Sequence, residues 1–319
     1  MKNEKTNVEQ DAFVSSLEEL STCDIAPKLP RNYPPVSSFL LKGAVIVVLA
    51  AVMIYCLSEV LASVRGYREA DDLYGVMSED WGALNTLLGE SFAVSKSDKN
   101  SHGSTTEEYG NPTMPEPPSN EESSDSATII MLKAKFEALK ETNPDVIAWI
   151  TVPETLIDYP IVHTSDNDYY LDHSFTGAKL ASGTIFADYR NKDDLSDKNT
   201  VIYGHNMASG AMFATLARFK INGFVNRSPY IYVQTENGIY VYRVFSVYET
   251  NKYDPYIRTS FTSANDFIEW AKSRQNKSLR KVSYKFDGDE QVITLSTCTN
   301  GFGDDGRLAV HAVLTEIRK

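Results

Sequence analysis

The sequence predicts a mostly-β fold, a closed β-barrel of eight strands with a few helices, preceded by one transmembrane helix. Two observations support this prediction: eight short apolar or alternating segments crowd the C-terminal part of the chain, and one long uncharged run lies near the N-terminus. Many short strands with few helices are typical of closed barrels. The strand segments are VIAWITV, LIDYPIVH, GTIFADY, NTVIYGH, YIYVQTE, GIYVYRVFSVYE, QVITLSTC and RLAVHAVLTEI.

Turn residues separate these strand segments. Pro153 follows the first segment, Gly183 and Asn199 begin two others, and an Asn237–Gly238 pair joins two alternating ones, which is a strong signal for a β-hairpin. The predicted helices are the following: IIMLKAKFEALKE at the start of the domain, residues 209–219 with Ser209 as N-cap, and residues 263–273.

The apolar run covers residues 39–57, and only Lys42 within it is charged. Extended by Val60 to Ala62, it is long enough to cross a bilayer of about 30 Å. A cleaved signal peptide fits less well, because a long polar segment precedes the run. A buried core helix remains the other alternative.

The basic residues around this run indicate its orientation. Lys28, Arg31 and Lys42 precede it or lie in it, against Arg65 and Arg68 after it. This imbalance mildly favours a cytoplasmic N-terminus, and hence a single-pass protein of the cell membrane whose C-terminal domain is extracellular. We therefore expect four segments: a cytoplasmic tail (1–36), a transmembrane helix (37–62), a juxtamembrane segment with a disordered linker (63–127) and a catalytic domain (128–319).

The charge and the cysteine content exclude several classes of function. The 319 residues include 43 acids and 31 bases, a net charge of −12, which argues against a nucleic-acid-binding protein. The three cysteines are far apart, and no CxxC or Cys/His metal spacing occurs. We therefore expect neither a disulfide framework nor a metal or other cofactor, and Cys298 is expected to be a free thiol.

Cys298 ends one predicted strand, and Arg307 begins the next. A hairpin places these two residues side by side. Nearby positive charge favours a reactive thiolate, and a guanidinium can stabilise the oxyanion that develops during acyl transfer. On their own, a small buried cysteine and a solvated strand arginine are the ordinary alternatives.

A cysteine nucleophile usually needs a histidine partner. His205 follows Gly204 at the end of an apolar strand, which leaves it free to face a cleft; a loop histidine without a role is the alternative. The other four histidines offer no comparable geometry. They are His102 in the linker, His163 and His173 beside a loop, and His311, which lies about 13 Å along its strand from Arg307 and is read as a surface or core residue.

Three separated sequence blocks resemble the signature of the sortases, which are membrane-anchored cysteine transpeptidases of Gram-positive bacteria. The blocks are YGHNM at 203–207, TLSTC at 294–298 and GRLAVHAVL at 306–314. Further similarity covers residues 143–162 and 183–191. Ser296, the asparagine after His205 and the helical insertion before the last hairpin are most similar to class B.

The resemblance implies a mechanism and partners. His205, Cys298 and Arg307 would be catalytic, and Ser296, Asn206 and Thr297 would contact the substrate. The thiol would cleave a C-terminal sorting motif of the type Asn-Pro-x-Thr-Asn/Gly in a surface protein. A thioacyl-enzyme would then transfer the protein to an amine of a peptidoglycan precursor or cross-bridge. The segment 253–282 would help to shape the groove for the motif.

Other functions are also compatible with parts of this sequence. A sortase of another class, such as a pilin polymerase or a class D enzyme, would share the three catalytic residues. An inactive membrane-tethered binding module would not need them. A papain-like protease fits poorly, because its cysteine precedes its histidine and lies on a helix.

Overall fold

A computed structural model of the chain describes residues 38–87, 125–299 and 305–319. The chain divides into two compact units, Met1–Glu59 and Val60–Lys319. All the strands that the structure describes lie in the second unit. The tail at 1–36 and most of the predicted linker lie outside the described residues.

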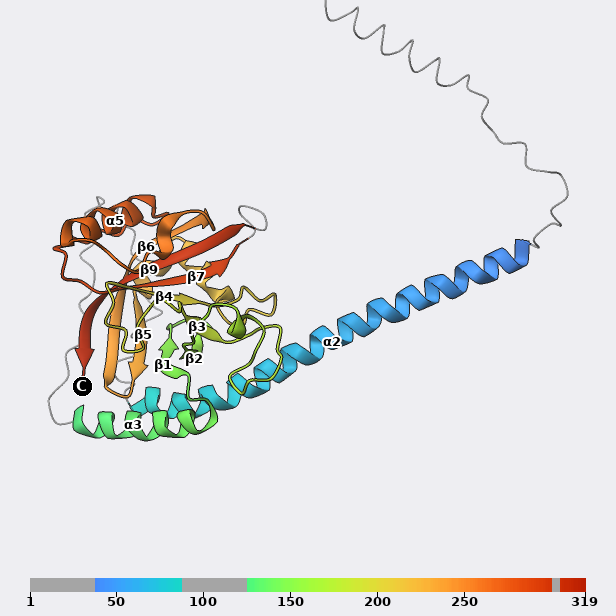
Figure 1. Cartoon of the computed structure of the whole chain (residues 1–319), viewed down its shortest axis with the longest axis horizontal. Helices are drawn as coiled ribbons and strands as arrows, with labels where there is room; N and C mark the ends of the chain where they lie inside the picture. Colours follow the sequence, from blue (N-terminus) through green and yellow to red (C-terminus); the bar gives the residue numbers. More distant parts are fainter. Residues whose placement is uncertain (1–37, 88–124, 300–304) are drawn as a thin grey trace, which may run out of the picture. The chain divides into compact units, whose positions relative to one another are not determined.

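Eight strands form a closed barrel in the order β1-β2-β3-β4-β7-β9-β6-β5 (Figure 1). This confirms the predicted fold class. The alternation of apolar residues and the turn residues between segments were therefore reliable guides. The strands are β1 Val146–Thr151, β2 Asp158–Val162, β3 Ile185–Ala187, β4 Asn199–Tyr203, β5 Tyr230–Thr235, β6 Gly238–Asn251, β7 Val292–Cys298 and β9 Gly306–Arg318.

The pairing of the last strands determines where the strand ends lie. β7 and β9 pair antiparallel, with Cys298 opposite Arg307, whereas β4 and β7 pair parallel, with Tyr203 opposite Ser296. Because parallel neighbours run in the same direction, the end of β4 and the end of β7 lie at the same edge of the barrel. The residue stretch after Tyr203 is thereby brought next to Cys298.

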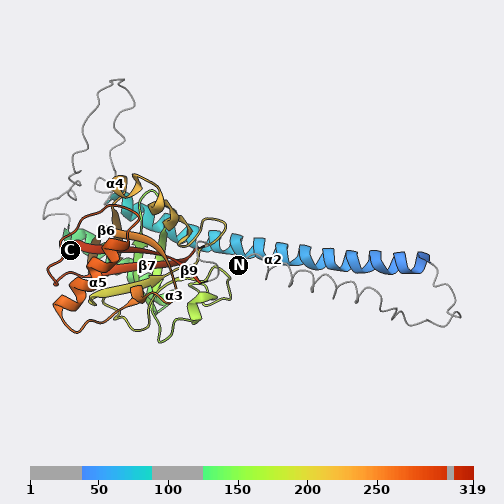
Figure 2. The same cartoon turned by 90° about the horizontal axis from the view of Figure 1, so that it is seen from above.

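Both faces of the β7–β9 sheet are buried along most of its length. Leu295 and Val310 pack in the main hydrophobic core, and His311 on the other face is also fully buried. That outer face is covered by α5, Ala264–Lys277, which begins with Ser263 as its N-cap (Figure 2). The predicted helix at 263–273 is therefore present and extends one turn further.

The helix expected at 209–219 is wrong in its start and in its type. The structure has a 3-10 helix, η2, at Ala214–Lys220, and Ser209 does not cap it. Gly210 and Met212 both have positive φ, at 91° and 54°, which a right-handed helix does not allow. The remaining short helices are η1 Tyr169–Leu171, α4 Phe224–Arg227 and η3 Pro255–Ile257.

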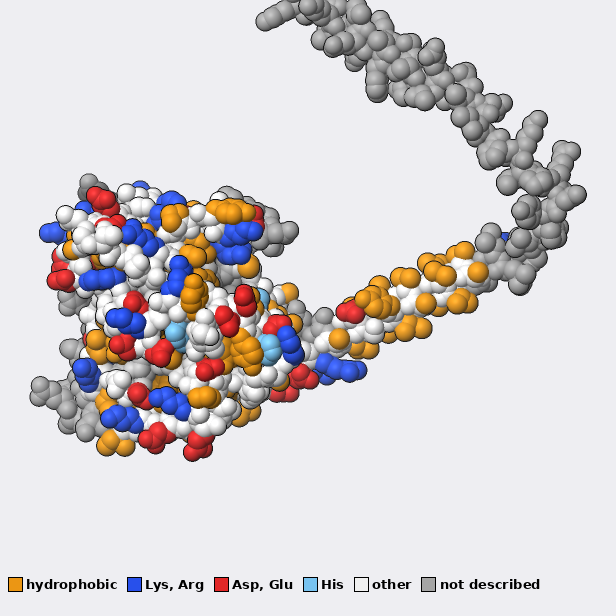
Figure 3. All heavy atoms as spheres, in the orientation of Figure 1, with side chains coloured by type: hydrophobic (Ala, Val, Ile, Leu, Met, Phe, Trp, Pro, Cys, Tyr) orange, Lys and Arg blue, Asp and Glu red, His pale blue; other side chains and the backbone are white. Residues whose placement is uncertain are grey.

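One long helix, α2, spans Ser38–Leu87. Within it, Ala44–Glu79 is long and apolar enough to cross a membrane, with a mean hydropathy of 2.5 in its most apolar window. Hydrophobic side chains cover the N-terminal part of α2 (Figure 3), and those of Val47 and Ile54 are largely exposed.

The last turns of α2 pack against the barrel within the second unit. Trp81 stacks on Trp149 of β1 with ring centroids 4.6 Å apart, and Phe136 of α3, Asp125–Thr142, meets Trp81 edge-on. The hydroxyl of Tyr74 donates to the backbone carbonyl of Gly183. This segment is thus part of the folded core and not only a connection to the apolar helix.

Candidate active site

Cys298 is the last residue of β7, and its thiol is exposed. Arg307 lies directly opposite on β9, and its Nη1 donates to the carbonyl of Gly306 at 2.8 Å. Residues paired across an antiparallel sheet project their side chains to the same face. The thiol and the guanidinium therefore project to one side of the hairpin, as the sequence predicted.

His205 follows β4 at the same edge of the barrel. Its Nε2–H donates to the carbonyl of Leu171 at 2.7 Å, which fixes the orientation of the imidazole ring. Gly204 is needed beside it, because a Cβ there would lie 2.4 Å from Ile185 Cδ1 and 2.8 Å from the ring of Phe213. The chain can therefore turn tightly around the core just before His205.

A pocket of about 210 Å³ brings the three predicted catalytic residues together. Its lining consists of Asn167, Leu171, Phe186, Tyr203, Gly204, His205, Ser296, Thr297, Cys298 and Arg307.

The predicted substrate-contacting residues are divided between two pockets. Ser296 lines the first pocket, where it is 2% exposed and its hydroxyl is bonded to that of Tyr256 at 2.8 Å. Asn206 lines a second pocket of about 430 Å³, which also borders Cys298. Thr297 and Cys298 line both.

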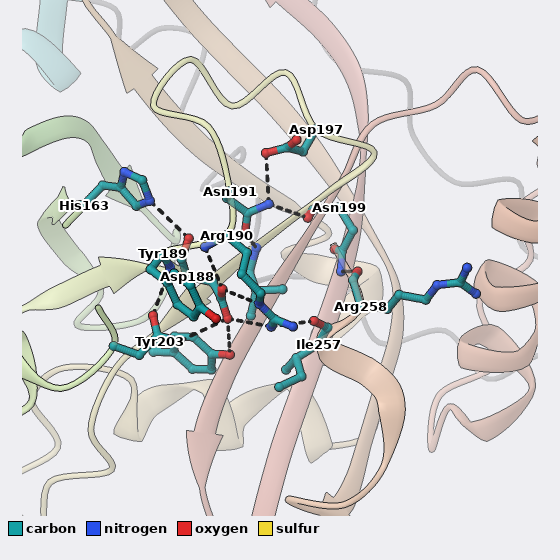
Figure 4. Close-up of polar contacts among 12 residues, drawn as sticks. His163, Asp188, Tyr189, Arg190, Asn191, Asp197, Asn199, Tyr203, Ile257 and Arg258 are labelled. Atoms are coloured by element: carbon teal, nitrogen blue, oxygen red, sulfur yellow. Dashed lines mark hydrogen bonds and ion pairs between the residues drawn. The ribbon is translucent and has the colours of Figure 1, made fainter. Parts of the chain in front are cut away.

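A buried carboxylate supports the wall of the first pocket (Figure 4). Asp188, whose side chain is fully buried, accepts two hydrogen bonds from Arg190 at 2.7 and 2.8 Å and one from the hydroxyl of Tyr203 at 2.8 Å. Asn167 Nδ2 also donates to it, at 3.3 Å. Burial alone would raise the pKa of Asp188, but the hydrogen bonds from Arg190 and Tyr203 outweigh burial and hold this pKa below its ordinary value.

Arg190 also reaches the segment after β6, since its Nη2 donates to the carbonyl of Ile257 at 3.0 Å (Figure 4). Two pocket residues, Asn167 and Tyr203, and the segment that carries Tyr256 are thereby tied to one ion pair. This group was not predicted from the sequence. Its signal was an aspartate and an arginine two positions apart after an apolar strand, in GTIFADYRN, but their burial cannot be read from local sequence.

His311 lies away from the thiol, as the spacing along its strand predicted. It is fully buried and shares hydrogen bonds with the hydroxyls of Thr294 and Tyr248, at 2.9 and 3.2 Å. Burial lowers the pKa of His311 to about 3, so its imidazole is neutral. His311 is thus a neutral, buried histidine. Within residues 38–87, 125–299 and 305–319, no group of three His, Cys, Asp or Glu side chains is arranged to hold a metal.

Comparison with known proteins identifies the family. Residues 150–315 match the sortase domain. Sortase B of Listeria monocytogenes is 37% identical over 184 residues, covering 57% of this chain and 75% of that protein, and sortase B of Staphylococcus aureus is 30% identical over 187 residues, covering 58% and 77%.

Solved structures agree with these matches. A mutant form of Clostridium perfringens sortase B has a TM-score of 0.57 and 34% identity, covering 61% of this chain and 92% of that one. A Staphylococcus aureus sortase B–substrate complex has a TM-score of 0.55 and 29% identity, covering 58% and 86%. The strand-end cysteine, the barrel and these matches lead to one conclusion: the chain belongs to the sortase family of cysteine transpeptidases, and within it to class B.

Proposed function

We propose that Cys298, His205 and Arg307 are the catalytic residues of this transpeptidase. The observation that carries the proposal is the pairing of Cys298 with Arg307 in one pocket with His205. Cys298 Sγ attacks the threonine carbonyl of a sorting motif, and Arg307 stabilises the oxyanion of the tetrahedral intermediate. The C–N bond then breaks as His205 gives a proton to the departing amine, which leaves a thioester on Cys298.

In the second half of the reaction, an amine of a peptidoglycan precursor or cross-bridge attacks the thioester carbonyl. A new C–N bond forms, the C–S bond breaks, and His205 accepts the proton that the amine loses. By analogy with class B, the sorting motif is of the type Asn-Pro-x-Thr-Asn/Gly, and it belongs to a surface protein. The Staphylococcus aureus sortase B relative has been solved in complex with a substrate, which supports substrate binding by this fold.

We further propose that the apolar part of α2 anchors the enzyme in the cell membrane, with the N-terminus in the cytoplasm and the barrel outside. Its length, its apolar composition and the exposure of its side chains support the anchor. The excess of Lys and Arg on its N-terminal side supports the orientation.

The test uses the full chain in detergent micelles and a set of Asn-Pro-x-Thr-Asn peptides with different residues at x. We expect cleavage between Thr and Asn, an amide product when an amine is added, and a mass increase on Cys298 from the thioacyl group. Cys298→Ala should remove all three signals. Cys56→Ser is the matched control, because Cys56 is the other exposed cysteine of the described residues and lies in α2. Full activity of Cys298→Ala would refute the proposal.

A further inference from the structure

Two pockets meet at the end of β7, where Thr297 and Cys298 line both of them. Cys298 pairs with Arg307, and both line the first pocket. One residue back, Thr297 pairs with Leu308, and Leu308 pairs with Glu249 of β6. Because successive side chains of a strand alternate between faces, the row Glu249–Leu308–Thr297 points away from the face of Cys298 and Arg307. This row lines the second pocket, of about 430 Å³.

Glu249 gives the second pocket a carboxylate. Its Oε1 accepts hydrogen bonds from Lys220 Nζ at 2.8 Å and from Thr299 Oγ1 at 2.6 Å. Hydrogen bonds from Lys220 and then Thr299 lower the pKa of Glu249, so it is ionised at neutral pH. No donor from the described residues bonds to its Oε2, and the side chain is 26% exposed. A carboxylate oxygen is thus left for a ligand that donates a hydrogen bond.

Lys220 is not equally available to a ligand. Its ammonium already forms an ion pair with Glu249. The pocket therefore offers a ligand a hydrogen-bond acceptor more readily than a positive charge. Apart from Leu308, the rest of the lining is small or polar, and it includes Asn206, Ala214, Ala217 and Thr299. Such a pocket suits a primary ammonium on a narrow, flexible chain better than an anionic or a large apolar group.

The chemistry of acyl transfer requires two binding regions around one thiol. The acyl part of the first substrate stays on Cys298 after the leaving amine departs. By microscopic reversibility, the attacking amine then reaches the carbonyl along the direction in which the leaving amine left. The first pocket, with Leu171, Phe186 and Arg307, suits the acyl part of an extended peptide. The region for the amines must therefore adjoin the thiol on another side.

We propose that the second pocket binds the amine-bearing second substrate, and that Glu249 holds its ammonium before attack. This inference rests on the proposed function of Cys298. The ammonium donates to Glu249 Oε2, loses one proton to His205 as it approaches, and attacks the thioester carbonyl as the free amine. The C–N bond forms, the C–S bond breaks, and the thiol of Cys298 is restored.

The test compares the two half-reactions in the full chain, with a sorting peptide as acyl donor and diglycine as amine. The α-amine of diglycine is mostly protonated at pH 7, because such groups titrate near pH 8. Glu249→Gln keeps the shape of the side chain but removes its charge. Losing one charge-assisted hydrogen bond should raise the KM for diglycine about tenfold. The KM for the sorting peptide should change less than twofold.

Two further acceptor measurements separate charge recognition from a general loss of structure. Hydroxylamine is small and largely uncharged at neutral pH, so its use as acceptor should change little in Glu249→Gln. Ala217→Leu places bulk at the exposed edge of the pocket and should also raise the KM for diglycine. Glu236→Gln is the matched control, since Glu236 pairs with Lys140 near the opposite end of β6 and should leave both KM values unchanged.

The outcomes distinguish this inference from the proposed function. If the wild-type chain forms no thioacyl group on Cys298, both are overturned. If the wild-type chain transfers to diglycine, but Glu249→Gln and Ala217→Leu keep the wild-type KM for it, the pocket assignment alone is overturned. An equal rise in the KM values for peptide and amine would also overturn it, because that result indicates a disturbed thiol and not a lost amine contact.

Discussion

Arg190→Gln tests how far one ion pair supports the peptide side of the active site. The substitution leaves the carboxylate of Asp188 fully buried and removes the two hydrogen bonds from the guanidinium, while those from the backbone N–H of residue 190 and from the Tyr203 hydroxyl remain. Removing one partner of a buried ion pair typically costs about 3–5 kcal/mol. Here Arg190 is 38% exposed and Tyr203 still donates to Asp188, so we expect a loss of about 2–3 kcal/mol. At about 2–4 °C per kcal/mol, the melting temperature should fall by about 4–12 °C.

The pH dependence of this loss gives a second, more specific readout. In the wild type, the pKa of Asp188 lies below 3.8, so its contribution to stability is present above that pH and is lost as the pH falls through the folded-state pKa. Without the guanidinium, the opposing effect of burial should raise the pKa of Asp188 from its wild-type value. The variant should then protonate Asp188 at a higher pH than the wild type, and it should recover part of its deficit as the pH falls from 7 into the acid range.

The assay is thermal unfolding of the full chain in detergent, followed by tryptophan fluorescence across this pH range. Arg227→Gln is the control, because Arg227 pairs with Glu154 at the surface with side-chain exposures of 53% and 31%, and should cost less than about 1 kcal/mol. Arg190→Gln should also raise the KM for the sorting peptide, since Asn167 and Tyr203 line its pocket. A melting temperature within 1 °C of wild type, or a deficit that does not change with pH, would refute the reasoning.

Two further substitutions test the packing around the barrel. Trp81→Ala removes a 2%-exposed ring that stacks on Trp149, so the free energy of unfolding should fall by about 3–5 kcal/mol in denaturant titrations; a loss below 1 kcal/mol would show that this part of α2 does not belong to the folded core. Ser263→Ala removes the N-cap of α5, whose hydroxyl accepts from the backbone N–H of Asp266, and should cost about 1 kcal/mol. For the latter, Ser263→Thr should retain most of the stability, and an equal loss in both variants would contradict a capping role.

The strands were predictable because local pattern determines them. The Asn237–Gly238 pair lies at the tight connection of β5 to β6, with Thr235 opposite Gly238. The same argument placed Cys298 next to Arg307, since a hairpin register depends on the residues on either side of its turn. Local sequence patterns were therefore sufficient to predict both the β5–β6 connection and the pairing of Cys298 with Arg307.

The neighbourhood of His205 depends on a pairing that no local rule supplies. β4 and β7 are parallel neighbours, although they lie far apart along the chain, and the sequence reached this arrangement only through the resemblance to a family. The Asp188–Arg190 pair was missed for a related reason. A charged pair after a strand is usually a solvated turn, and only the assembled barrel buries it.

The face alternation of β7 offers a physical reason for a nucleophile at the last position of the strand. A side chain within β7 belongs to one face, and both faces there are filled by packed residues such as Leu295 and Ser296. At Cys298 the strand stops, the side chain becomes exposed, and Cys298 lines both pockets. If one pocket holds the acyl group and the other delivers the amine, the two substrates need not compete for the same space, and the thioester can wait for its acceptor without releasing the peptide side. A cysteine moved two residues inward, to position 296, would keep the same face but lose access to the second pocket.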